Sequence, residues 1–155
     1  MKLNNASTKA LLAVDIGNTN THLAIFQKSR VIKTFSYPAT LKSGECIKKF
    51  CAGFAIKDAI IVSVVPAATK KIEKALVKIF GKRPYIVGKN ITVPMRNCYR
   101  RPQTLGQDRL VNAFAASQLY GAPAIVISLG TCLTFNIISR KRTYEVGMIF
   151  PGLGM

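Results

Sequence analysis

Two stretches of this chain share one pattern: LLAVDIGNTNTHLAIF at residues 11–26 and AIVISLGTCLTFNII at residues 124–138. In each stretch, a run of apolar, strand-forming residues meets a turn that contains glycine and then resumes as a second run. When Ser128 is aligned with Asp15, Gly130 falls on Gly17, and the basic turn after the second copy falls near the polar turn after the first. The pattern predicts a duplicated unit of strand, glycine turn and strand.

The residues between the two copies predict a mixed α/β sheet. Pro66 ends a continuous apolar strand, and apolar residues at helical spacing follow it until Gly81. A strand, a helix and a further strand in that order require a crossover connection. The expected elements are strands at 31–35, 59–65, 85–87 and 146–150, helices at 41–54, 72–80 and 105–120, and a long loop at 88–104.

The composition is that of a globular domain. The chain has 155 residues, of which 49% are hydrophobic and 19% are charged. The longest uncharged stretch, 110–139, is broken by a Gly-Ala-Pro sequence at 121–123, so we expect no membrane span. The apolar run after Lys9 meets Asp15 too early for a signal-peptide core, so we expect no secretion. The four cysteines and the single His22 show no metal-ligand or disulfide-scaffold spacing.

The most unusual feature of the composition is the net charge of +17, which favours polyanionic partners in general. The basic residues form short, scattered clusters, with no continuous basic arm and no aromatic-interleaved signature of RNA binding. A solvated basic surface is therefore the simpler interpretation, and we do not expect nucleic-acid binding. Such binding would require a steep loss of affinity with salt.

The turn that follows Asp15 has the residue types of a phosphate site. A carboxylate ends a strand, Gly17 lets the backbone approach a ligand, and the amides and hydroxyl of Asn18 and Thr19 can hold phosphate oxygens, with a metal near Asp15. The alternative is a plain hairpin connection. Because the chain has no Walker A sequence and no protein-kinase signature, ATP chemistry here requires a different phosphate cradle.

A second candidate lies at the start of the helix after the long loop. Asp108 can accept a proton from a substrate hydroxyl, and Arg109 can orient an anionic group. The alternative is an acidic residue in a first helical turn, where the macrodipole favours it. The chain has only six acidic residues, and two of them, Asp15 and Asp108, fall at these positions. Gly130 and Thr131 in the second copy form either another phosphate-binding turn or a buried hairpin turn.

The duplicated plan resembles that of the actin, sugar kinase and Hsp70 superfamily, with its ribonuclease H-like, actin-like ATPase fold. Within it, the chain from Leu11 onward is similar to type III pantothenate kinases. The motifs that carry the resemblance are Asp15-Ile16-Gly17-Asn18-Thr19-Asn20-Thr21-His22, Ser63-Val64-Val65-Pro66, Tyr99 with Pro102, Leu105-Gly106-Gln107-Asp108-Arg109, Gly130-Thr131 and Ile149-x-Pro151-Gly152-Leu153.

The resemblance implies an ATP-dependent phosphorylation of pantothenate to 4′-phosphopantothenate, the first step of coenzyme A biosynthesis. It implies magnesium, a monovalent cation (potassium or ammonium) and a cytoplasmic homodimer. It assigns ATP binding to Asp15, Ile16, Gly17, Asn18, Thr19, Asn20, Thr21, His22 and Thr131, pantothenate binding to Tyr99, Gly106, Gln107, Asp108 and Arg109, and the role of proton acceptor to Asp108.

The chain departs from the family's pattern in two places. Ser128 stands where the family has an aspartate that binds the monovalent cation, and a neutral hydroxyl is the weaker ligand for a hard cation. We also expect one full lobe at 10–123 and only the start of a second lobe at 124–155, with apolar strand surface left uncovered. This predicts poor solubility or dependence on a partner chain, and the alternative function is a non-catalytic homologue that binds a partner.

Overall fold

A computed structural model describes residues 9–41 and 43–152 of the chain. The chain divides into two compact units, the first ending at Ile91 and the second beginning at Thr92. Each unit has its own sheet and its own buried cluster. The predicted lobe boundary after Pro123 remains a prediction. The division at Ile91 follows contacts within the chain, and it places helix α3 (Gln107–Leu119) in the second unit because α3 packs on the strands of that unit.

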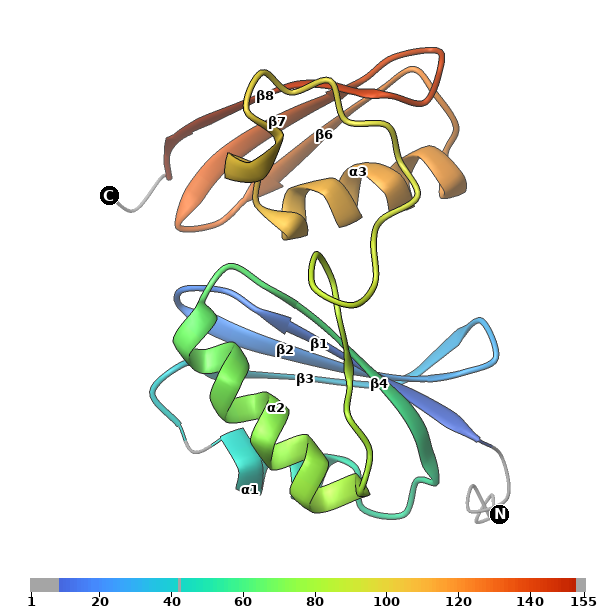
Figure 1. Cartoon of the computed structure of the whole chain (residues 1–155), viewed down its shortest axis with the longest axis vertical. Coiled ribbons are helices and arrows are strands. Elements are labelled where there is room, and N and C mark those ends of the chain that lie inside the picture. The colour runs from blue at the N-terminus through green and yellow to red at the C-terminus, as the bar shows by residue number, and fades with distance from the viewer. Residues whose placement is uncertain (1–8, 42, 153–155) are drawn as a thin grey trace. The chain divides into compact units, whose positions relative to one another are not determined.

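The first unit is a mixed sheet covered on one face by two helices (Figure 1). Its strand order is β3-β2-β1-β4-β5, with β1, β2 and β3 antiparallel and β4 and β5 parallel to β1. The mixed sheet with crossover helices confirms the predicted α/β class. The elements are β1 (Ala10–Ile16), β2 (Asn20–Gln27), β3 (Arg30–Pro38), α1 (Ser43–Phe50), β4 (Ile56–Ser63), α2 (Pro66–Phe80) and β5 (Tyr85–Ile86).

Helix α2 ends at the predicted Gly81 but begins at Pro66, before the predicted start at Ile72. Pro66 occupies the first turn, where a missing N–H costs nothing. Gly81 closes the helix with φ of 69°, and its N–H donates to the Val77 carbonyl at 2.8 Å. This left-handed C-cap favours glycine because a Cβ would be strained there. In α1, Lys33 of the neighbouring strand donates to the final carbonyl, that of Phe50, at 2.9 Å.

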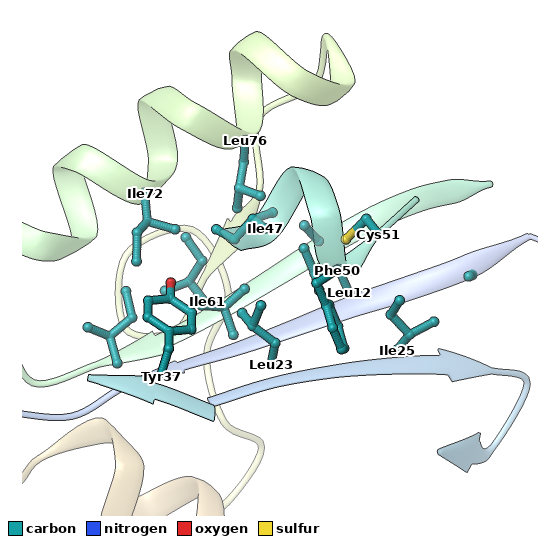
Figure 2. Packing of buried hydrophobic residues seen from close by; sticks show 14 of the residues in the cluster. Leu12, Leu23, Ile25, Tyr37, Ile47, Phe50, Cys51, Ile61, Ile72 and Leu76 are labelled. Atoms are coloured by element: carbon teal, nitrogen blue, oxygen red, sulfur yellow. The ribbon is translucent and has the colours of Figure 1, made fainter. Parts of the chain in front are cut away.

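The core of the first unit lies between the sheet and helices α1 and α2 (Figure 2). Alternate residues of β1 and β2 point into it, which is the period of two expected for a strand. Ile47 of α1 and Ile72 and Leu76 of α2 meet them from the helices. Full burial of each such side chain stabilises the fold by about 1.5–3 kcal/mol.

Cys51 lies at the edge of this core, and we expect it to be the least reactive of the cysteines. Burial raises the pKa of its thiol to about 11, against the opposing effect of the Lys33 charge. At pH 9 the lower thiolate fraction alone slows alkylation about 50-fold relative to an ordinary thiol. Timed iodoacetamide labelling followed by peptide mass spectrometry measures this, with the exposed Cys98 and Cys132 as internal controls. Labelling of Cys51 at the rate of Cys98 would contradict it.

The raised pKa of Cys51 also predicts the direction in which stability changes with pH. The folded-state pKa of Cys51 lies above its unfolded value, so its contribution to the free energy of unfolding is complete below about pH 9 and is lost as the pH rises through 11.

The second unit is an antiparallel meander with α3 on one face (Figure 1). Its strands are β6 (Ala124–Leu129), β7 (Cys132–Ile138) and β8 (Tyr144–Pro151), and a 3-10 turn, η2 (Pro102–Thr104), precedes α3. The meander repeats β1-β2-β3, and the last hairpin of each copy contains a non-glycine residue with positive φ, Lys28 and Arg142. The described residues contain no helix long and apolar enough to cross a membrane.

The face of this sheet opposite α3 is apolar and exposed. Alternate residues of each strand point to it, and cross-strand pairing arranges them in three rows. Exposure is largest on β6, where Leu129 is 74% and Ile127 54% exposed. The rows are Ile125 with Ile137 and Val146, Ile127 with Phe135 and Met148, and Leu129 with Leu133 and Phe150. This matches the predicted uncovered strand surface.

We expect Ile127→Lys to reduce binding of the dye 8-anilinonaphthalene-1-sulfonate and to raise solubility, because Ile127 lies in the middle row of the apolar face. Unfolding should shift by less than about 0.5 kcal/mol, since the side chain is mostly exposed. The matched control is Val126→Lys, on the neighbouring position that packs in the buried cluster, which should destabilise the unit. Unchanged dye binding in a folded Ile127→Lys protein would contradict the prediction.

Candidate functional site

The stretch from Asp15 to His22 forms the β1–β2 hairpin in the first unit. The N–H of Gly17 donates to the Asn20 carbonyl at 2.9 Å, and a Cβ on Gly17 would meet that carbonyl oxygen at 3.2 Å. Asp15 and His22 face each other across the strands and are exposed, as are Asn18 and Thr19. Ile16 and Thr21 are buried, so their side chains belong to the core and only their backbone is available to a ligand.

The Ser63–Pro66 motif lies against this hairpin. Ser63 is the parallel partner of Ile16, and the N–H of Val64 donates to the Ile16 carbonyl at 3.2 Å. The Ser63 hydroxyl accepts the N–H of Val65 at 3.0 Å, which turns the chain from β4 into α2. Two motifs that are about 45 residues apart in sequence therefore meet at the carboxyl ends of the neighbouring strands β1 and β4.

The second unit brings Tyr99, Asp108 and Arg109 together around Tyr144. The loop before α3 is tied to β8 by backbone bonds: the N–H of Cys98 donates to the Tyr144 carbonyl at 2.8 Å, and the N–H of Tyr144 donates to the Arg96 carbonyl at 2.8 Å. The Tyr99 ring then packs edge-on against the Tyr144 ring, with centroids 6.3 Å apart.

Asp108 lies in the first turn of α3, behind the N-cap residue Gly106. Its Oδ1 atom is buried and accepts no hydrogen bond from the described residues. A buried carboxylate oxygen without a donor costs free energy, so such atoms are rare in native proteins. The first-turn position favours the negative charge through the helix dipole, and the open acceptor is what a proton acceptor for a substrate hydroxyl requires.

Arg109 points into the unit and is only 7% exposed. Its Nε donates to Asn136 Oδ1 at 2.7 Å, and one terminal nitrogen donates to the carbonyls of Phe135 at 3.1 Å and Met148 at 3.3 Å. The hydroxyl of Tyr144 donates to the same Asn136 oxygen at 2.8 Å. Burial raises the pKa of Tyr144, against the opposing charge of Arg109, so this hydroxyl stays protonated at neutral pH.

Glycine at position 147 makes room for this cluster. A Cβ there would overlap the terminal nitrogen of Arg109 and the hydroxyl of Tyr144. Position 147 therefore accepts only glycine while Arg109 keeps this direction.

The Gly130-Thr131 turn, which joins β6 to β7, is bonded to the residue that follows β8. The N–H of Gly152 donates to the Thr131 carbonyl at 3.1 Å, and a Cβ on Gly152 would overlap the carbonyl oxygens of Gly130 and Thr131. The Gly130-Thr131 and Ile149-x-Pro151-Gly152 motifs thus meet in space, while Leu153 of the second motif lies outside the described residues. Ser128 is half-buried and pairs across the strands with Thr134.

Three members of the Asp108 cluster, namely Asn136, Tyr144 and Gly147, were missed by the sequence analysis. Asn136 did leave a signal: it is a polar residue two positions before Ile138 in an otherwise apolar stretch, so it points to the same buried side. A buried amide needs partners, which marks it as part of a network. Nothing local distinguishes Tyr144 from an ordinary strand tyrosine.

Solved structures with similar folds support the fold class. The chain aligns with the Aquifex aeolicus Ppx/GppA phosphatase, type II variant, with a TM-score of 0.57 at 14% identity, covering 92% of this chain and 52% of that one. It aligns with the ethanolamine utilization protein EutJ from Carboxydothermus hydrogenoformans with a TM-score of 0.53 at 13% identity, covering 97% and 54%. At such identities these likenesses concern the fold alone, and they confirm the predicted actin-like fold.

The sequence comparisons concern the family. The family described as type III pantothenate kinase matches residues 11–155. The type III pantothenate kinase of Persephonella marina is 36% identical over 153 residues, which cover 92% of this chain and 60% of that protein. That of Syntrophobacter fumaroxidans is 38% identical, with 92% and 59% covered. The chain thus spans about three fifths of the length of these relatives, and it belongs to the type III pantothenate kinase family.

Proposed function

We propose that this chain phosphorylates pantothenate from ATP and forms 4′-phosphopantothenate, the first step of coenzyme A biosynthesis. The observation that carries the proposal is the buried Oδ1 atom of Asp108, which accepts no hydrogen bond from residues 9–41 and 43–152. It lies in the family's Gly106–Arg109 motif. A carboxylate in this state is suited to accept the proton of a hydroxyl group that attacks a phosphoryl group.

The proposal assigns two kinds of contact, one to pantothenate and one to ATP. Tyr99 and the first turn of α3, from Gly106 to Arg109, hold pantothenate, and Asp108 accepts the proton from its hydroxyl. The proposal assigns the phosphates of ATP to the hairpin from Asp15 to His22 in the first unit. It assigns a separate ATP contact to Thr131, as in the family. Bound ATP with magnesium would supply the phosphoryl group and neutralise its charge.

The hairpin residues fit magnesium bound through phosphates. Among residues 9–41 and 43–152, no three His, Cys, Asp or Glu side chains gather into a metal site. Magnesium in nucleotide sites needs less than that, because it keeps several waters and takes one or two carboxylates besides the phosphate oxygens. The exposed carboxylate of Asp15, next to the Gly17 turn, meets this requirement.

A monovalent cation fits less well. Ser128 and its cross-strand partner Thr134 offer neutral hydroxyl oxygens at the position where the family has a carboxylate. We therefore expect activity that depends weakly on potassium or ammonium. A homodimer in the cytoplasm, as in the family, belongs to the same proposal.

The test is mass-spectrometric detection of phosphopantothenate made by the purified chain with ATP and magnesium, with and without potassium. Product that requires both ATP and pantothenate supports the proposal. No product from folded, soluble protein would overturn it and would favour the non-catalytic alternative.

A further inference from the structure

Asn136 joins four elements of the second unit through one side chain. It is fully buried on β7. Its Oδ1 accepts the Arg109 Nε–H from α3 at 2.7 Å and the Tyr144 hydroxyl from β8 at 2.8 Å, and its Nδ2 donates to the Val126 carbonyl of β6 at 3.4 Å. An amide with all these bonds has one orientation, because turning it over would bring donors against donors.

This amide fixes the direction of Arg109. Without it, the guanidinium would keep only the two carbonyl contacts, of Phe135 and Met148, which share a single terminal nitrogen. Contacts through one nitrogen leave the planar group free to swing, whereas a further bond at Nε holds the plane. Arg109 forms no salt bridge with the described residues, so these neutral acceptors alone hold it.

A fixed Arg109 in turn fixes Asp108. Successive residues of an α-helix are separated by about 100° around the axis. When Arg109 is held against the sheet, the rotation of the first turn of α3 is set, and with it the direction in which the Cα–Cβ bond of Asp108 leaves the helix. A displacement of about 1 Å in a reacting group can cost about 100-fold in rate.

Folding alone gives little reason for the polar network as a whole, although loss of Asn136 by itself would leave Arg109 and Tyr144 short of an acceptor. The buried cluster around it is otherwise apolar, formed by Leu105, Leu110, Ala113 and Ile138 with the Tyr144 ring. Replacing a buried polar network by apolar groups of similar shape is often neutral for stability. The network therefore has its main use in fixing a geometry.

We propose that Asn136 is a positioning residue: it holds Arg109 through Nε and thereby sets the direction in which Asp108 presents its carboxylate to the substrate hydroxyl. The inference rests on the proposed function. Asn136 itself touches no substrate.

The test compares Asn136→Leu, Asn136→Ser and Asn136→Asp in steady-state kinetics, with rates expressed per folded molecule. Leu removes the acceptor, and the hydroxyl of Ser is too short to reach Nε, so each should lower kcat about 100-fold while leaving KM for ATP within about twofold. Asp keeps an acceptor oxygen in place and should restore kcat to within about fivefold of the original. The Asn136→Ser variant also tests the proposal if the Asn136→Leu variant does not fold.

The matched control is Ser117→Ala. Ser117 is a buried residue of the same helix, and its hydroxyl donates to the Phe114 carbonyl at 2.8 Å, so the variant loses one buried hydrogen bond away from Asp108. A purely structural role for Asn136 would change the folded fraction, as this control does, and leave kcat per folded molecule intact.

The two kinds of failure differ. Phosphorylation by the original chain together with unchanged kcat in folded Asn136→Leu and Asn136→Ser would overturn the positioning role and leave the proposed function standing. So would an Asn136→Asp variant as slow as Leu. Absence of phosphorylation by the original chain would overturn the proposed function, and the positioning role with it.

Discussion

Asp108→Asn is expected to lower the rate of phosphopantothenate formation about 1,000-fold, the range for loss of a general base. The substitution keeps the shape of the side chain and removes the negative charge that accepts the proton. Because Asp108 Oδ1 accepts no hydrogen bond from the described residues, the folded state loses no bond of that atom. The melting temperature should therefore stay the same or rise slightly, since a buried charge costs free energy.

The measurement is product formation per folded molecule beside a thermal melt. Asp58→Asn is the control: it makes the same chemical change at an exposed carboxylate that forms a salt bridge with Lys82 in the first unit. That variant should keep its rate and change stability little, because solvent screens an exposed ion pair. An Asp108→Asn enzyme with the original turnover would remove Asp108 from the mechanism.

Gly147→Ala is expected to destabilise the second unit by about 3 kcal/mol. The new Cβ would overlap the guanidinium of Arg109 and the hydroxyl of Tyr144, and both groups are held by Asn136. To remove this overlap, the Arg109 side chain must move, which breaks its buried hydrogen bonds and leaves polar atoms without partners. Activity should fall with it, since the position of Asp108 depends on Arg109.

Urea unfolding followed by amide NMR signals from α3 would measure the loss. Gly130→Ala is the matched control, because its Cβ would find only the Cys132 carbonyl oxygen, at an ordinary contact distance of 3.9 Å. We expect that variant to unfold within about 0.5 kcal/mol of the original chain. Equal midpoints for the two variants would show that the Arg109 cluster is looser than the structure describes.

The fold was predictable from sequence because its signals are local. The Gly17 turn and the Gly81 end of α2 are each set by backbone chemistry within a few residues, whereas α2 begins at Pro66 and not at the predicted Ile72. The ends of elements were less accurate. Strand β3 runs from Arg30 to Pro38, beyond the predicted 31–35, because pairing with β2 continues through polar residues that carry no apolar signal.

The candidate site was predictable only in part. The motif residues Tyr99 and Asp108 do meet in the second unit, around Tyr144. The inward direction of Arg109 could not be predicted, because it depends on Asn136, 27 residues later, and on the Met148 carbonyl, 39 residues later. Sequence gives the identity of a long side chain, whereas its direction is decided by packing between distant strands and helices.

The loop that carries Tyr99 has a consequence for how this site changes through evolution. Arg96 and Cys98 contact β8 through their backbone oxygen and nitrogen, atoms that every residue except proline possesses in full. Mutations at these two positions can accumulate without moving the tyrosine, provided that Cys98 does not become proline. Position 97, between them, is different: the Oδ1 of Asn97 accepts the Tyr99 N–H at 2.9 Å, so there the side chain itself helps to place the tyrosine.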